Sequence, residues 1–380
     1  MGKFITRCLS VILSVLLASC SVLASPANNE GVRWRLAYYE GGSWVDYQGE
    51  FVALVDSLVS LGWIEPFEWP ATGSQDDMLL LWDWLAGHAK STYIEFVKDA
   101  FWSSDWQSEL RLRNRADVIA RLSSVGDIDL ILAMGTWAGL DLANDQHSTP
   151  TLVMSTNNPV QAGIIKSVHD SGFDHVHARA DPDRFIRQIT AFHNLVGFER
   201  LGIIYDDTAE GRVFAVLDDA LTVANRLGFE LVTCMAPDSD VSEDQAVELA
   251  FACLEELAPQ IDGFLITSHI ALTAEHLPGV LAPLFQYNVP TWALEGPDLV
   301  KRGALMSIQR ESYQAIGQFQ ARNVDQILNG VLPRQLNQIL EEPKALAVNL
   351  EVARQIGFDL PPGLITVADV VFETIEGESL

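Results

Sequence analysis

The chain has 380 residues, of which 48% are hydrophobic, and a formal net charge of −27 at pH 7. This acidic surface repels phosphate backbones and anionic lipid headgroups, so we expect no nucleic-acid partner. Roughly 350 residues follow the N-terminal segment, which is more than one hydrophobic core usually holds, so two domains are expected.

Residues 1–19 have the pattern of a signal peptide. Lys3 and Arg7 supply positive charge, and the apolar run from Cys8 to Leu17 is too short to span a bilayer as an ordinary helix. No later stretch is long enough to cross a membrane. The mature protein is therefore expected outside the cytoplasm.

The residues Leu17-Ala18-Ser19-Cys20 fit the lipoprotein cleavage pattern. Cys20 would then become the N-terminus and carry acyl chains such as palmitate, and residues 20–31, which are small and polar, would form a tether. The alternative is cleavage after Ala24, which would leave a soluble exported protein. The first reading predicts attachment to the cell envelope through lipid alone.

Strand-like apolar runs alternate with helical patterns along the first half of the chain. This alternation predicts repeated βα units and a parallel sheet. The expected strands are 35–39, 92–101, 130–134 and 151–155, and the expected helices are 49–61 and 108–122.

A second series follows and predicts a second parallel sheet. Its expected strands are 200–205, 230–234, 263–267 and 291–294, and its expected helices are 212–227 and 243–257. Residues 174–181 interrupt the alternation and are expected to cross between the domains, with later crossovers near 296–298 and 333–340. The resulting N-terminal lobe would comprise 32–176 and 297–335, and the C-terminal lobe 177–296 and 336–380.

Residues 65–90 do not fit the alternation and are interpreted as an insert in the first lobe. The segment opens with prolines and then forms an apolar helix that contains Trp82 and Trp84, with Trp69 ahead of it. Such an aromatic stripe favours core packing, and a ligand lid or a partner surface is the alternative.

Two cysteines, Cys234 and Cys253, remain once Cys8 is removed and Cys20 is lipidated. Cys234 lies near the end of an expected strand and Cys253 in the helix that should pack back on it. In an oxidising compartment these two residues could form a disulfide, and two buried thiols are the alternative.

Motifs for catalysis, cofactors and metals are missing. The chain has neither a P-loop nor a Gly-x-Gly-x-x-Gly turn, so no nucleotide cofactor is expected. His169, His175 and His177 cluster near the first crossover, with the last two on one face if the segment is extended, but without other ligands at a recognisable spacing no metal site is expected. No Ser-His-Asp grouping stands out, and we expect no enzyme.

The loops at the carboxyl ends of the strands are polar, and this is where an open α/β sheet binds ligands. In the first half these loops offer amides and hydroxyls suited to a carboxylate: Gly135, Thr136, Thr156, Asn157 and Asn158. In the second half they offer hydroxyls and carboxylates suited to an ammonium group: Tyr205, Asp206, Asp207, Thr267, Ser268 and Glu295. Trp44, Tyr47 and Trp137 lie beside the same strand ends and could cover an apolar side chain. Helix caps and turns favour many of the same polar residues, which is the alternative at each position.

Several segments together resemble the substrate-binding proteins of ABC transporters with the type I periplasmic binding fold, in the group that includes tryptophan- and tyrosine-binding proteins. They are 129–136 (DLILAMGT), 158–163 (NPVQAG), 201–205 (LGIIY), 301–305 (KRGAL) and 348–369. The resemblance implies two Rossmann-like lobes, joined by three crossovers, that close on a small ligand and deliver it to a permease and its ATPase. The insert 65–90 departs from the family pattern.

The resemblance, the expected anchor and the absence of catalytic motifs favour a monomeric binding protein of an importer, with an apolar or aromatic amino acid as ligand. A ligand sensor that signals to a membrane receptor is the alternative, and an exported hydrolase is a third reading.

Overall fold

The computed structural model describes residues 26–70, 78–294, 296–309, 313–341 and 345–376. The expected signal peptide and Cys20 lie outside these residues. Within the described ranges, no helix has both the length and the apolar character needed to span a membrane.

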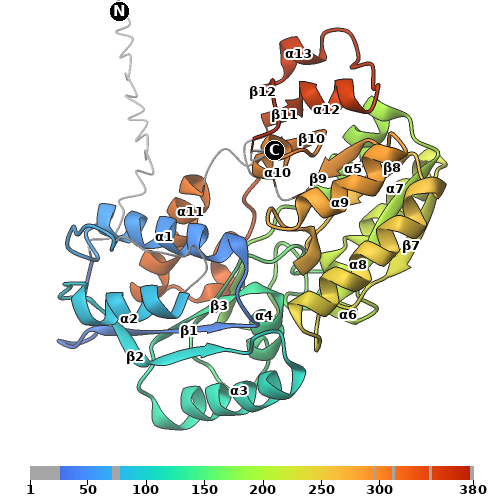
Figure 1. The fold of residues 1–380 in the computed structure, drawn as a ribbon. Helices are drawn as coiled ribbons and strands as arrows, with labels where there is room; N and C mark the ends of the chain where they lie inside the picture. Colours follow the sequence, from blue (N-terminus) through green and yellow to red (C-terminus); the bar gives the residue numbers. More distant parts are fainter. Residues whose placement is uncertain (1–25, 71–77, 295, 310–312, 342–344, 377–380) are drawn as a thin grey trace, which may run out of the picture.

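Two lobes lie side by side in Figure 1, each built on its own sheet. The first sheet has the order β2-β1-β3-β4-β5 and is parallel throughout. Its strands are β1 (Trp34–Glu40), β2 (Ile94–Ser103), β3 (Leu130–Met134), β4 (Thr151–Met154) and β5 (Val176–Ala178). The helices of this lobe are α1 (Val45–Ser60), α2 (Met78–His88), α3 (Ser108–Ala120), α4 (Gly135–Leu142) and α11 (Gln314–Leu328).

The second sheet has the order β12-β11-β10-β9-β8-β6-β7. Its strands are β6 (Arg200–Tyr205), β7 (Glu230–Met235), β8 (Gly263–Ile266), β9 (Thr291–Ala293), β10 (Met306–Gln309), β11 (Ala345–Asn349) and β12 (Val370–Phe372). Its helices are α5 (Arg184–Val196), α6 (Ala209–Phe214), α7 (Leu217–Leu227), α8 (Glu243–Leu257), α9 (Leu277–Gln286), α10 (Pro297–Lys301), α12 (Leu350–Gln355) and α13 (Leu364–Val367). The expectation of a purely parallel sheet is wrong here, because β10 and β11 run antiparallel.

The inner strands of both sheets are buried because each sheet has apolar clusters on both of its faces, and this explains the continuous apolar sequences of these strands. All five residues of β3 are buried, for example, and so are the four residues of β8. Such runs made these strands recognisable from sequence.

Two of the expected lobe boundaries are wrong. β5 pairs with β4, so the first sheet continues to Ala178 and the first crossover starts later than residue 177. β10 pairs with β9 and β11, so residues 297–309 belong to the C-terminal lobe. The turn at Gly296 and Pro297 does not cross between the lobes, because it begins the short helix α10 that leads to the next strand of the same sheet.

α11 returns to the first lobe although it lies late in the sequence, and Figure 1 shows it beside α1. A Cβ atom on Gly317 would lie 2.3 Å from the Ala53 carbonyl, so only glycine allows the two helices to approach this closely. Ala321, Val324 and Leu328 of α11 complete the core around α1.

Two crossover segments pair with each other on the way between the lobes. The Ala180 N–H donates to the Gln338 carbonyl at 2.8 Å, and the Leu340 N–H donates to the Ala180 carbonyl at 3.0 Å. The segment that leaves the first sheet and the segment that returns from α11 therefore form a short parallel ribbon.

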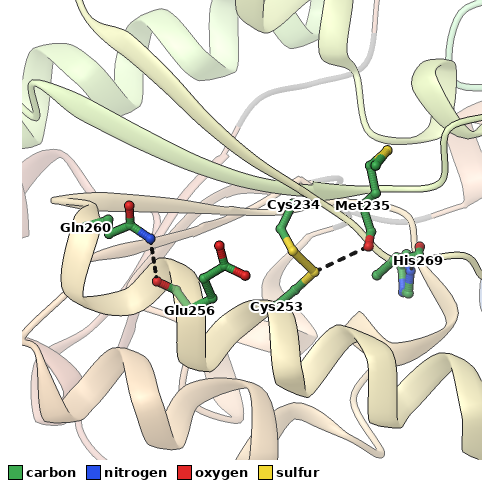
Figure 2. The surroundings of a disulfide bond; sticks show 7 residues. Cys234, Met235, Cys253, Glu256, Gln260 and His269 are labelled. Carbon is green, nitrogen blue, oxygen red and sulfur yellow. Dashed lines mark hydrogen bonds between the residues drawn. A yellow bond between two sulfur atoms is a disulfide. The ribbon is translucent and has the colours of Figure 1, made fainter.

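The cysteines of the second lobe form a disulfide between β7 and α8 (Figure 2). The Cα atoms of Cys234 and Cys253 are 5.7 Å apart, within the usual range for such a bond. The Cys253 sulfur also lies 3.5 Å from the Met235 carbonyl oxygen, at the end of β7. The bond thus fixes the strand that leads into the cleft.

The insert packs into the first lobe through its inner face. Trp82 is fully buried, and its indole N–H donates to the Val97 carbonyl at 3.0 Å. Met78, Leu81 and Leu85 join it in the core. The core-packing interpretation of Trp82 is therefore correct.

His175 and His177 do not share one environment, contrary to the expectation for an extended segment. The His175 ring lies edge-on against His147, whose centroid is 4.6 Å away. His177 faces α11 instead, with Nε2 3.0 Å from the Asn337 carbonyl and 3.3 Å from the Asn323 amide nitrogen. Only His177 lies within β5, so the strand periodicity does not include His175.

Candidate ligand-binding cleft

A cavity lies between the lobes at the carboxyl ends of the strands. Its volume is about 470 Å³, counting the part open to solvent. The first lobe contributes Trp44, Tyr47, Trp106, Thr136, Ser155 and Asn157, and the second lobe contributes Phe214, Asp238, Ser239, Ser268 and Ile270.

Trp106 forms the centre of an aromatic wall. Its indole N–H donates to the Ser43 carbonyl at 3.0 Å, and its ring lies edge-on to Phe214 of the opposite lobe, with centroids 6.2 Å apart. A Cβ atom on Gly42 would lie 2.7 Å from the Trp106 ring, so glycine is required for this packing. The ring thus reaches from one lobe to the other beside the cavity.

Two cavity residues have a strained backbone. Trp106 and Ser155 have φ angles of 56° and 51°, in the left-handed region that non-glycine residues rarely occupy. Such strain costs roughly 1 to 3 kcal/mol per residue and concentrates at ligand sites. The surrounding packing therefore holds these two residues in an unfavourable backbone conformation, and this conformation sets the direction of their side chains.

The N-terminus of α4 lies at the cavity. Gly135 has a φ of 84°, and a Cβ atom on it would lie 1.9 Å from the Tyr47 hydroxyl oxygen, so Tyr47 covers the first turn closely. The next residue, Thr136, lines the cavity. The main-chain N–H groups and dipole of a helix N-terminus favour an anionic ligand group.

Asp238 supplies a carboxylate from the second lobe. One of its oxygens accepts the Ile270 N–H at 3.3 Å, and burial raises the pKa of this carboxyl above its usual value. His269 lies 4.0 Å away. Its Nδ1 accepts the Ala271 N–H, so Nε2 carries the proton and donates to the Ala236 carbonyl at 3.0 Å. His269 therefore donates to a main-chain carbonyl and not to Asp238, whose carboxylate faces the cavity.

Asp206 supports the loop that carries Asp238. Its carboxylate accepts the main-chain N–H groups of Asp238 and Ser239 at 3.3 and 3.2 Å. Asp206 does not line the cavity, and one of its carboxylate oxygens holds the neighbouring loop through both of these N–H groups.

Side chains bridge the lobes around the cavity. The Asn157 amide donates to the Ser268 hydroxyl at 3.1 Å and to the Phe214 carbonyl at 3.3 Å. Arg111 of α3 pairs with Glu210 of α6 at 2.8 Å and with Asp141 of its own lobe at 3.0 Å. The two lobes thus contact each other directly.

Two buried threonine hydroxyls flank the cavity residues. Thr156 lies between Ser155 and Asn157, and Thr267 precedes Ser268. Neither Oγ1 atom has a hydrogen-bond partner in the described part of the chain. A buried hydroxyl without a partner costs free energy, so both positions suit a donor or acceptor that arrives with a ligand.

One group in the described ranges has ligand atoms close enough together for a metal: Glu243, Glu275 and His276, within 4.8 Å of one another. His276 already lies 3.1 Å from Glu243, an ordinary ion-pair arrangement, and both glutamates are exposed. None of the three lines the cavity, and we assign no metal to them.

Comparison with known proteins decides the family. The model described as "ABC transporter substrate binding protein" matches residues 102–372, which is more than half of the chain. The chain belongs to this family of ABC transporter substrate-binding proteins. It is accordingly a binding protein and not an enzyme, with a small ligand and an ABC transporter as its partners, and such proteins act outside the cytoplasm.

Solved structures show the same fold. A conserved domain protein from Vibrio cholerae is 16% identical with a TM-score of 0.66, covering 89% of this chain and 99% of its own. An ABC domain in complex with L-Trp from Streptococcus pneumoniae is 15% identical with a TM-score of 0.66, covering 90% of this chain and 100% of its own. A substrate-binding protein with adhesive properties from Clostridium difficile, in a ligand-free open structure, is 16% identical with a TM-score of 0.56 and covers 90% and 100%. No curated protein matches this substrate-binding protein.

These likenesses confirm the α/β class and the type I periplasmic binding fold with two lobes. Identities of 15 and 16% show a shared fold alone, and the ligand class of this substrate-binding protein depends on the residues of its own cleft.

The cleft brings together five of the residues expected from sequence: Trp44, Tyr47, Thr136, Asn157 and Ser268. Four others lie next to lining residues in the chain, namely Gly135, Trp137, Thr156 and Thr267. The Trp137 ring stacks under the Arg111 guanidinium at 4.5 Å and thereby supports the bridge between the lobes.

Three further candidates, Asn158, Tyr205 and Asp207, do not line the cavity. Asn158 accepts the Gln161 N–H at 3.1 Å within a turn. Asp207 is more than half exposed and lies 3.5 Å from Arg212, whose guanidinium is also 5.8 Å from the Tyr205 ring centroid. Glu295 lies outside the described residues.

Six lining residues were not expected from sequence: Trp106, Ser155, Phe214, Asp238, Ser239 and Ile270. Ser155 directly follows β4, and its position at the carboxyl end of a strand could have identified it as a lining residue. Trp106 follows β2 by three residues, in a loop whose left-handed backbone no sequence pattern indicates.

Proposed function

We propose that this substrate-binding protein captures a zwitterionic amino acid with an apolar or aromatic side chain. The observation that supports this most is the pairing of one buried carboxylate, Asp238, with an aromatic wall in a single cavity. Asp238 would hold the ammonium group, and the N-terminus of α4 with Thr136 and Ser155 would hold the carboxylate. A cleft that pairs both charges away from water discriminates against analogues that lack either charge.

The apolar part of the ligand would lie among Trp44, Trp106, Phe214 and Ile270. Flat rings supply large contact area with little loss of side-chain entropy, and their edges are suited to another aromatic ring. The S. pneumoniae protein solved with L-Trp has this fold, which supports an amino acid as a ligand class that the fold can hold.

Titration calorimetry against a panel of amino acids tests the proposal. The wild type should bind an apolar or aromatic amino acid, and Asp238→Asn should lose about 2 to 5 kcal/mol of affinity, or roughly thirtyfold to several-thousandfold. Asp207→Asn is the matched control, because Asp207 is exposed and should leave affinity unchanged. Binding of a sugar or an uncharged aromatic, with no amino acid bound, would show the proposal to be wrong.

We also propose that Cys20 carries the lipid that attaches the protein to the cell envelope. The sequence LASC supports this, and residues 21–25 leave only a short link to the described chain. Cys20→Ala should release the protein from the membrane fraction, because acyl chains supply the strong attachment. Cys8→Ala is the control and should remain attached. Equal membrane retention of the two variants would contradict the anchor.

A further inference from the structure

α2 carries large apolar residues around most of its surface, interrupted by Asp83, and only some of these residues are buried. Its sequence is MLLLWDWLAGH, and Met78, Leu81, Trp82 and Leu85 are buried. On the other side, Leu79 and Leu80 are 48% and 59% exposed. A helix that is apolar all round is normally buried all round, so two exposed leucines are unusual on such a helix.

The exposed face continues into a cluster of aromatic rings. Leu80, Trp84 and His88 follow one another at helical spacing, and the Trp84 and His88 rings stack with centroids 5.1 Å apart. Phe67 and Trp69, from the segment before α2, lie 5.1 and 6.1 Å from Trp84. We refer to Phe67, Trp69, Leu79, Leu80 and Trp84 as the insert patch.

The tryptophans of the insert patch are not a tightly buried core. Trp69 and Trp84 are half-buried, and the Trp69 indole N–H donates to the Asp56 carboxylate at 2.8 Å. Tryptophans with an apolar body and a satisfied N–H are enriched at the interface between membrane and water.

The described chain begins beside this patch. The Pro26 side chain lies 3.9 Å from the position that a Cβ atom would take on Gly62. The Trp34 indole N–H donates to the Ala27 carbonyl at 2.7 Å. Gly62 follows α1, and Asp56, which binds Trp69, is six residues earlier, or roughly 9 Å along the helix axis. The insert patch and the start of the chain therefore lie at the same end of the first lobe.

We propose that the insert patch docks on the surface of the bilayer that holds the lipid anchor, which rests on the proposed lipidation of Cys20. From Cys20 to Pro26 an extended chain spans at most roughly 20 Å, so the anchored lobe stays within that distance of the membrane. The insert patch contacts zwitterionic lipid headgroups, because the net charge of −27 on the protein disfavours contact with anionic lipid. The contact orients the lobes relative to the membrane, whereas the acyl chains alone would leave the protein free to tumble.

An environment-sensitive fluorophore tests the orientation. The probe is attached to Leu79→Cys in the full-length lipidated protein on phosphatidylcholine vesicles. Val367→Cys is the matched control, because Val367 is 67% exposed but belongs to the second lobe. We expect a blue shift, and loss of emission with chain-brominated lipids, at position 79 and neither change at position 367. Equal behaviour of the two probes on protein that floats with the vesicles would overturn the proposal.

Two further outcomes distinguish membrane docking from a contact with the permease and from failure of the lipid anchor. A probe at position 79 that responds only when the vesicles contain the permease would assign the patch to the transporter and overturn membrane docking. If the protein does not float, the anchor is wrong, and the soluble chain is then mixed with excess phosphatidylcholine vesicles. Quenching at position 79 but not 367 would still support the patch, and equal signals would overturn it as well.

Discussion

Asp240 of the C-terminal lobe accepts hydrogen bonds from both the main-chain N–H and the hydroxyl of Ser108, each at 2.7 Å, at the start of α3 in the other lobe. The residue that precedes α3, Gln107, makes no side-chain cap. Asp240 therefore caps a helix across the cleft, and the cap exists only while the lobes are together.

Loss of this cap should favour the open protein. We predict that Asp240→Ala weakens ligand binding by about 1 to 2 kcal/mol, or roughly five- to thirtyfold, because closure loses a capping interaction. Small-angle scattering should show a larger radius of gyration for the variant without ligand. Asp244→Ala, on the exposed surface of α8, is the control, and equal radii for the two variants would show that the cap does not hold the lobes together.

Replacing the buried threonine hydroxyls should affect ligand affinity more than stability. Thr156→Val and Thr267→Val remove hydroxyls without partners, so the melting temperature of the free protein should stay the same or rise, while ligand affinity falls. Thr151→Val is the contrasting control. The Thr151 hydroxyl donates to the Thr149 carbonyl at 3.0 Å, and its loss should destabilise the protein by about 1 kcal/mol. Unchanged affinity in the first two variants would remove these hydroxyls from the site.

Ligand affinity should fall in mild acid through Asp238. Burial raises the pKa of this carboxyl above 3.8, so it becomes neutral at a higher pH than an ordinary aspartate and then no longer pairs with an ammonium group. Calorimetry over a pH series should show the loss in the wild type and little pH dependence in Asp238→Asn. The same dependence in both proteins would indicate that another group is responsible.

Buried histidines should lower the stability of the protein as the pH falls. Burial lowers the pKa of His147 and His177 to about 4 each, against an ordinary value of 6.5. Between these values the unfolded chain binds a proton that the folded chain excludes. Each histidine therefore removes roughly 1.4 kcal/mol of stability per pH unit as the pH drops from 6.5 toward 4, and above 6.5 the full stability is present. Urea unfolding at pH 7 and pH 5 measures this, with His147→Gln expected to reduce the difference and the exposed His169→Gln expected to preserve it.

Reduction of the disulfide should destabilise the second lobe. Cys234 and Cys253 are 19 residues apart, and closing a loop of this size contributes about 3 kcal/mol. β7 leads directly to the loop of Asp238 and Ser239, so ligand affinity should also decrease. Thermal unfolding with and without reductant tests this, and a Cys234→Ser, Cys253→Ser double variant should no longer respond to reductant. An unchanged melting temperature in the wild type would contradict the prediction.

Local patterns made most strands of the two lobes predictable, because a strand covered on both faces needs a continuous apolar run. β3 and β6 have the bounds expected from sequence. The pairing of β10 with β11 was not predictable, since it joins segments on either side of α11 and depends on contacts remote in sequence.

The carboxylate at the cavity was harder to predict, because two neighbouring loops both carry aspartates. Asp206 follows β6 directly and looked like the ligand carboxylate, yet the amides of the next loop bind it and leave Asp238 at the cavity. The expected helix 212–227 is broken because Val216 has a φ of 49°, a conformation that branched residues rarely adopt. α6 ends at Phe214 just before this break, and Phe214 lines the cavity.

The ribbon formed at Ala180 and Ile339 restricts how the lobes can move. The two hydrogen bonds at Ala180 keep these crossovers from sliding past each other, so both segments bend together. The lobes should therefore open and close along nearly one path. Every ligand that closes the cleft should place the outer surfaces of the two lobes in the same relative position. A transporter that recognises this relative position would detect that a ligand is bound without contacting the ligand.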